Sequence, residues 1–204
     1  MNGTTQPAHE PGQPGAQVMT MARNGELAGQ WKLDPEASQA EFRVRHFWHA
    51  ITVRGSFTEV SGEGTVGPDG TASGTLVIAA ASLTTNNKQR DKHLRSADFF
   101  DADNHPRVTV TVRQATLAAD GQLTAEGTLE AAGTTEPVTF TAEIIEASPD
   151  AVTLRASLTI DRSRFGMTWS PLRMAAMDAT GTVTARFTRQ PDGGPSGGEE
   201  FSVR

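Results

Sequence analysis

The chain has 204 residues, a formal net charge of −6 at pH 7 and no cysteine. This length suits one domain with a sizeable core, and the acidic balance, without a basic stripe, argues against nucleic acid as a partner. The lack of cysteine excludes disulfides, thiol catalysis and thiolate metal sites.

The two ends of the chain lack the apolar periodicity of a packed segment. Residues 1–28 and 191–204 are rich in Gly, Pro and polar residues, so they can bury too little surface to offset the cost of ordering. We predict that both are disordered and flank one folded domain over residues 29–190. We also find no secretory signal and no apolar run that could span a bilayer, and therefore expect a soluble, cytoplasmic protein.

Between the ends, apolar and polar residues alternate in eight runs, a period that is typical of strands with one buried face. The runs cover residues 40–46, 51–58, 76–80, 108–113, 123–130, 138–144, 152–160 and 182–188. Asp-Gly and Ser-Pro-Asp turns favour hairpins, so consecutive strands should be antiparallel neighbours. The sequence predicts an all-β fold, an eight-stranded antiparallel up-and-down barrel, with a two-sheet β-sandwich as the alternative.

Many residues on the inward side of these runs are small, among them Gly55, Ala142 and Ala156. A barrel of eight strands has an interior that side chains either fill or leave open for one ligand. Small inward residues favour a cavity, although two closely packed layers would use the same residues.

The longest interruption of the strand pattern runs from Ser82 to Pro106 and carries many charges together with Phe99 and Phe100. Asn86 or Asn87 can cap a short helix that ends near residue 96. In an up-and-down topology this interruption lies at the same end as residues 47–50, 131–136 and 161–178. The aromatic and methionine side chains of these segments would form an apolar lid over the interior.

Five residues of this interruption have the chemistry of a metal or acid–base site, because His titrates near neutral pH and Asp with His is a common ligand or proton-transfer pair: Arg90, Asp91, His93, Asp101 and His105. No hydrolase or metalloprotease motif accompanies them. We favour a structural role, in which Arg–Asp pairs and a helix cap hold the segment across the barrel end. An enzyme that uses Arg90, Asp91 and His93 is the alternative, and we predict no metal and no cofactor.

Several motifs resemble those of the YceI-like family over residues 31–189. They are Trp31-x-Leu33-Asp34-Pro35, Phe42-x-Val44-x-His46, Val53-Arg54-Gly55-x-Phe57, Arg90-Asp91-x-His93-Leu94-Arg95-Ser96-x-Asp98-Phe99-Phe100-Asp101 and Asp161-Arg162-x-x-Phe165-Gly166. The resemblance implies a lipocalin-like barrel with an apolar tunnel, no established catalytic reaction, and frequent dimers. It also implies a bound polyisoprenoid, isoprenoid quinone or other amphiphilic lipid.

From the residues and the resemblance together we predict non-catalytic binding of a long-chain isoprenoid or similar amphiphilic lipid, such as a polyprenyl phosphate or a fatty-acid-like molecule. Binding would serve carriage, storage or sequestration, in a monomer or a homodimer. A filled β-sandwich that acts as an interaction module is a further alternative. The predicted tunnel and rim residues are Phe42, Val44, His46, Trp48, Val53, Phe57, Leu76, Ile78, Leu94, Phe99, Phe100, Val110, Phe140, Ala142, Ile144, Ala156, Leu158, Ile160, Phe165, Met167 and Trp169.

Overall fold

The computed structural model describes residues 14–46, 51–118, 122–170 and 175–191. Its strands are β1 (Gly29–Leu33), β2 (Gln39–His46), β3 (Ile51–Phe57), β4 (Val60–Val66), β5 (Ala72–Ala79), β6 (Leu83–Thr84), β7 (Arg107–Leu117), β8 (Leu123–Ala131), β9 (Thr134–Ala147), β10 (Ala151–Asp161) and β11 (Ala175–Arg189). The helices are α1 (Pro14–Arg23) and α2 (Lys88–Arg95), with 3-10 turns η1 (Ala80–Ser82) and η2 (Arg162–Phe165).

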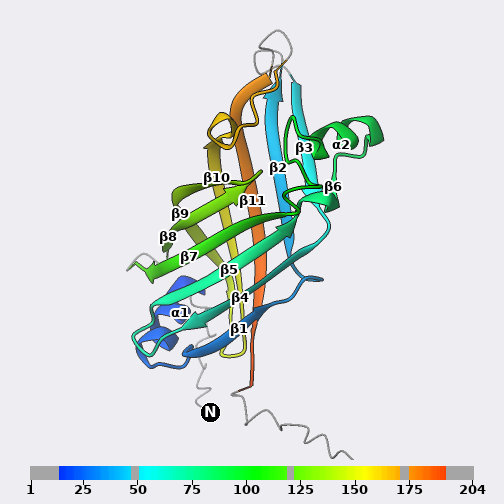
Figure 1. The fold of residues 1–204 in the computed structure, drawn as a ribbon. Helices are drawn as coiled ribbons and strands as arrows, with labels where there is room; N and C mark the ends of the chain where they lie inside the picture. Colours follow the sequence, from blue (N-terminus) through cyan, green and yellow to red (C-terminus); the bar gives the residue numbers. More distant parts are fainter. Residues whose placement is uncertain (1–13, 47–50, 119–121, 171–174, 192–204) are drawn as a thin grey trace, which may run out of the picture.

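The strands form one antiparallel sheet that closes on itself (Figure 1). The ring runs β1-β4-β5-β7-β8-β9-β10-β11, and it closes because β11 pairs with β1 as well as with β10. Across the closure Trp31 lies opposite Arg189, and Leu33 lies opposite Phe187. The predicted eight-stranded antiparallel barrel is therefore confirmed, since closure leaves eight strands in the ring and removes their free edges.

Two of the predicted barrel strands occupy a different place. β2 and β3 lie outside the ring and extend the sheet from the other part of β11, while β1 and β4 take part in the closure. β1 and β2 lie one after the other along the same edge of β11, because the extended strand is interrupted between Leu33 and Gln39. At this break the Ser38 hydroxyl donates to the Asp34 carbonyl (2.6 Å) and accepts from the Arg186 N–H (3.0 Å).

β4 does not show the apolar–polar alternation by which strands are recognised, because glycines stand at its inward positions. A Cβ at Gly62 would lie 2.8 Å from the Thr75 carbonyl oxygen, and a Cβ at Gly74 would lie 2.5 Å from the Glu63 carbonyl oxygen. β4 and β5 thus approach each other at positions that only glycine fits, which is a common reason for glycine within strands.

The predicted loop over residues 131–136 is instead a two-residue turn. Ala132 and Gly133 both have positive φ, 47° and 76°, and Ala131 pairs with Thr134. Positive φ at both central residues is the conformation that joins neighbouring strands most tightly. β8 and β9 therefore continue to their shared end without a loop.

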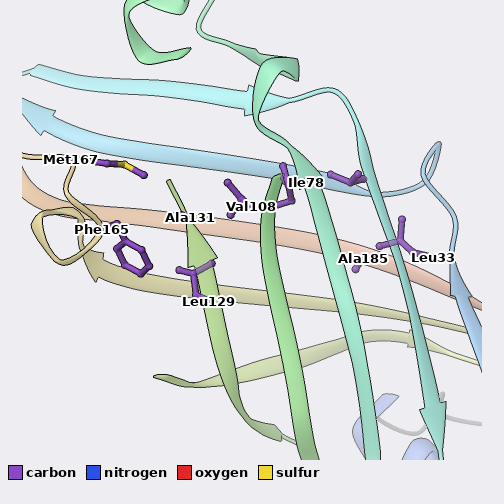
Figure 2. Packing of buried hydrophobic residues seen from close by; sticks show 10 residues of the cluster. Leu33, Ile78, Val108, Leu129, Ala131, Phe165, Met167 and Ala185 are labelled. Atoms are coloured by element: carbon purple, nitrogen blue, oxygen red, sulfur yellow. The ribbon is translucent and has the colours of Figure 1, made fainter. Parts of the chain in front are cut away.

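A cluster of buried hydrophobic residues lies on the inner faces of the strands and on the segment after β10. Leu33, Ile78, Val108 and Leu129 contribute to it from four different strands. Figure 2 shows Phe165 and Met167, from the segment after β10, near Leu129 and Ala131 at the end of β8. The segment after β10 is thus part of the core rather than a free loop.

The structure differs from the predicted disorder over residues 14–28. α1 buries Val18 and Met21 against the barrel, and Leu27 is buried just after it. The helix ends at Arg23, and Gly25 follows it with positive φ (70°). Glu26 N–H donates to the Met21 carbonyl (2.9 Å), and Gly25 N–H donates to the carbonyl of residue 22 (3.1 Å). This is the glycine-terminated C-cap known as the Schellman motif. Residues 1–13 and 192–204 lie outside the described residues.

Candidate functional site

An apolar cavity of about 370 Å³ lies between α2, the segment after β10, the β2–β3 extension and the adjoining walls of the barrel. Its size falls within the range of small-molecule sites, which are usually apolar with a few polar groups. The predicted site residues that line it are Phe42, Val44, Val53, Phe57, Leu76, Ile78, Leu94, Phe99, Phe100, Val110, Phe140, Ala156, Leu158, Ile160, Met167 and Trp169.

Three predicted tunnel residues lie elsewhere. Ile144 lines a second, smaller cavity near α1, and Phe165 is 3% exposed in the core cluster. Ala142 is buried and lines neither cavity. It shares a face of β9 with Phe140, which lines the first cavity, and with Ile144, which lines the second, so along β9 it lies between the residues that line the two cavities. The side chain of His46 and all of Trp48 lie outside the described residues.

Twelve further lining residues, all apolar or glycine, were not among the predicted tunnel and rim residues. Ala40, Val108, Val112, Leu129, Leu154, Val183, Ala185 and Phe187 line the cavity and already stood on the inward side of predicted strands. Counting every inward position would have found them. Ala131, Ala175, Ala179 and Gly181 lie at strand ends or on the part of β11 that the alternation did not reach.

The aromatic side chains of α2, of the segment after it and of the segment after β10 meet at the mouth of the cavity. The His93 ring lies edge-on to Trp169 (centroids 4.4 Å apart), and Trp169 also contacts Phe99 (5.7 Å). Deeper inside, Phe100 lies edge-on to Phe57 (5.7 Å). Trp169 is 39% exposed, so the mouth, defined here as His93, Phe99 and Trp169, presents aromatic surface at the entrance.

Asp91 holds α2 onto the strand segment before it. The carboxylate is buried, its Oδ1 accepts from the Thr85 N–H (2.8 Å) and hydroxyl, and its Oδ2 accepts from the Thr84 hydroxyl (3.3 Å). Arg90 reinforces the same contact by donating from Nη2 to the Thr85 carbonyl (3.0 Å). The helix begins at an N-cap, Asn87, whose Oδ1 accepts from the Arg90 N–H (3.0 Å).

The other polar residues of this segment also contact neighbours within it. His93 Nε2 lies 3.0 Å from Asp98 Oδ2. Asp101 has positive φ (46°) and accepts from the Asn104 side-chain amide (3.0 Å), while its Oδ2 lies 3.8 Å from His105 Nε2. Among the described residues, no cluster of three or more His, Asp or Glu side chains could hold a metal ion.

Burial by itself would raise the pKa of Asp91, but the hydrogen bonds from Thr85 and Thr84, with Arg95 nearby, lower it overall. A lowered folded-state pKa contributes stability above the carboxyl pKa of the unfolded chain, about 3.9, and this contribution disappears as pH falls through the folded value. A general acid or base needs a pKa near the working pH. The pKa of Asp91 is shifted away from neutral pH, so the carboxyl group is not tuned for acid–base catalysis.

We expect Asp91→Asn to lower the free energy of unfolding by about 1–3 kcal/mol at neutral pH, because the three donors from Thr84 and Thr85 lose a charged acceptor. Urea unfolding over a pH series checks this. The gap between the variant and the wild type should hold above about pH 4 and close as the medium becomes more acidic. A gap that stays constant into acid would show that the carboxylate charge does not hold α2.

Arg162 is a lining residue that sequence reasoning did not choose for the site. It is 4% exposed, and its guanidinium donates to the carbonyls of Trp169 (3.0 Å) and Ala176 (3.0 Å) and to that of Met167. Burial lowers its pKa, an effect that Asp161 partly opposes. The guanidinium carbon also lies 5.6 Å from the Phe99 ring centroid. Arg162 therefore holds the segment that carries Met167 and Trp169 in place over the cavity.

A closed antiparallel barrel with an apolar cavity under a loop-covered mouth is the architecture of lipocalin-like β-barrels. The chain belongs to the YceI-like family, since the model of the YceI-like domain matches residues 31–188. This match confirms the resemblance that the sequence motifs carry. Within the described residues, no helix is long and apolar enough to cross a membrane.

Individual relatives agree with this assignment. UPF0312 proteins of Vibrio cholerae are 32% identical over 127 residues, which are 60% of this chain and 67% of theirs. The structure of Burkholderia cenocepacia BcnA has a TM-score of 0.69 at 19% identity, covering 76% of this chain and 98% of that one. A polyisoprenoid-binding domain from Saccharophagus degradans has a TM-score of 0.65 at 19% identity, covering 78% and 98%.

Proposed function

We propose that this chain binds a long-chain isoprenoid or a similar amphiphilic lipid inside its barrel and catalyses no reaction on it. The observation that carries the proposal is the cavity itself. Apart from Glu41, Arg90, His93 and Arg162, its described lining is made of apolar side chains and one glycine. Such a lining suits a hydrocarbon chain and offers few partners to a polar substrate.

Burial of hydrocarbon supplies the affinity. Each buried CH₂ contributes about 0.8 kcal/mol before ordering costs, so a long chain binds tightly with few polar contacts. Phe99, Phe100 and Leu94 would contact the part of the chain nearest the mouth. His93 and Arg90 of α2 are polar lining residues of the same segment, beside which a head group would lie.

The contacts of the charged residues support a non-catalytic role. Asp91 is occupied by two threonines and its pKa is lowered, while His93 contacts Asp98 and Trp169. These contacts position α2 and the mouth, so the acid–base alternative draws no support from them. The Saccharophagus degradans domain, which has a similar fold, is described as polyisoprenoid binding, and this supports the proposal of the same ligand class here.

Carriage, storage or sequestration of the lipid belongs to this proposal as its physiological purpose. Cytoplasmic location and a homodimer stay predictions. The alternative of a filled β-sandwich interaction module is disfavoured, because the sheet closes and encloses a cavity.

A fluorescent farnesyl analogue tests the proposal by titration into the full chain. We expect saturable binding, a blue-shifted probe emission that reports an apolar site, and displacement by unlabelled geranylgeraniol. Displacement by simple alcohols of the same polarity but without a long chain should fail, because they bury too little surface. No saturable binding, or equal displacement by the short alcohols, would contradict the proposed function.

A further inference from the structure

A second apolar cavity of about 200 Å³ lies at the end of the barrel that α1 covers. Figure 1 shows α1 and α2 at opposite ends of the molecule. All eight strands of the ring contribute to the lining of this cavity, for example Trp31 from β1, Ala115 from β7 and Leu123 from β8. Val18 and Ala22 of α1 complete it. The cavity is therefore the interior of the closed ring, with α1 across its end.

α1 lies outside the residues that the model of the YceI-like domain matches, which begin at residue 31. The segment that follows α1 is held firmly to the barrel. The Trp31 indole N–H donates to the Leu27 carbonyl (3.0 Å), and Arg189 donates to the carbonyls of Glu26 and Pro149 (3.0 Å for the latter). The Arg189 guanidinium also lies 5.0 Å from the Trp31 ring centroid.

The two cavities are adjacent rather than separate. Leu76, Val112, Leu154 and Phe187 line both of them. These four apolar side chains, here called the waist, come from β5, β7, β10 and β11 and lie where the two cavities meet. A waist made only of side chains can widen by rotamer changes, which are fast and inexpensive compared with any change in the sheet.

We propose that α1 closes the cavity beneath it as the end compartment for a hydrocarbon chain that enters at the mouth, and that α1 thereby limits the length of chain that the barrel can bury. The ligand class is a linear isoprenoid or alkyl chain, because both cavities have mainly apolar linings. This inference rests on the proposed function.

The test compares chains of increasing length, namely farnesol, geranylgeraniol and solanesol, by displacement of the fluorescent farnesyl analogue. Ala115 is buried and lines the α1 compartment alone. Ala115→Leu should leave farnesol affinity unchanged and weaken the longest chain that the wild type accepts by about tenfold or more, because the added methyl groups displace a buried part of that chain.

Ala156→Leu is the matched control, since Ala156 lines the mouth cavity alone. It should weaken all lengths, farnesol included. Ala22→Leu, on α1 itself, repeats the test with a residue outside the sheet in case Ala115→Leu fails to fold, and thermal melting of each variant establishes folding.

The outcomes separate the two claims. If the wild type binds none of the three alcohols, the proposed function is contradicted and the compartment has no role. If the wild type binds them and both compartment variants change farnesol and longer chains equally, or change neither, the inference about the compartment is overturned while the proposed function stands. Selective loss of the longer chains supports the inference.

Discussion

Replacing Ala156 by Trp is expected to abolish binding of the fluorescent farnesyl analogue. Ala156 lines the mouth cavity from β10 and lies opposite Ala142 and Val183 in the sheet. An indole at this position would occupy the space in which the hydrocarbon chain is buried, so most of the apolar contact that drives binding is lost. The measurement is the saturable change in probe emission on titration.

Ser157→Trp is the control, because Ser157 is the next residue of β10, is exposed, and bonds the Thr182 hydroxyl (3.0 Å) on the outer face. It adds the same side chain outside the barrel and should leave binding unchanged. Retained binding in a folded Ala156→Trp variant, or equal loss in both variants, would mean that the ligand does not occupy the cavity.

Gly127→Ala is expected to lower the free energy of unfolding by about 3 kcal/mol, because it forces backbone apart in a packed region. A Cβ at Gly127 would lie 1.9 Å from the Thr111 carbonyl oxygen and 3.0 Å from the Val112 Cα. β7 and β8 approach each other here beside a register shift between Val112 and Gln114. Urea unfolding of the variant gives the change directly.

Gly181→Ala provides the comparison within the same barrel. Its Cβ would meet no heavy atom nearer than 3.9 Å, the Glu41 carbonyl oxygen, so we expect the free energy of unfolding to change by less than about 1 kcal/mol. Similar destabilisation by both substitutions would show that loss of glycine as such, and not the β7–β8 contact, matters.

Alternation predicted the strands whose inward positions are filled by apolar side chains. The runs at 108–113, 123–130 and 152–160 fall within β7, β8 and β10, because Val, Leu and Ile mark one face of each. β1 escaped notice because it has five residues, and β4 because Gly62 and Gly64 replace the apolar residues that would mark its inner face. The need for glycine at these positions comes from the close approach of β5, which the local sequence of β4 does not reveal.

α1 had a local signal that went unused. Val18, Met21 and Ala22 have helical spacing, and Gly25 stands at the position of a helix C-cap. The high content of Gly, Pro and Gln in the flanking residues outweighed this signal. Composition alone could not indicate that the end of the barrel provides an apolar surface against which these side chains pack.

Strand alternation predicts the lining residues that lie on barrel strands, but it does not predict those outside the strands or the height of each residue along the barrel. Phe42, Val44 and Phe57 line the cavity as the alternation predicts. Arg162 could not be inferred, because its partners are carbonyl oxygens, which every residue carries. Ala142 was assigned to the tunnel because it lies on the inward face of its strand. Whether an inward residue lines a cavity also depends on its height along the barrel, which is set by the register between strands.

Native mass spectrometry of the full chain, purified gently and then incubated with farnesol or geranylgeraniol, tests the central claim most directly. The account predicts a complex of one lipid per chain that persists in the gas phase for the wild type and is absent for Ala156→Trp. A wild type that carries no lipid after purification and takes up neither alcohol would contradict the claim that the barrel interior is a lipid-binding site.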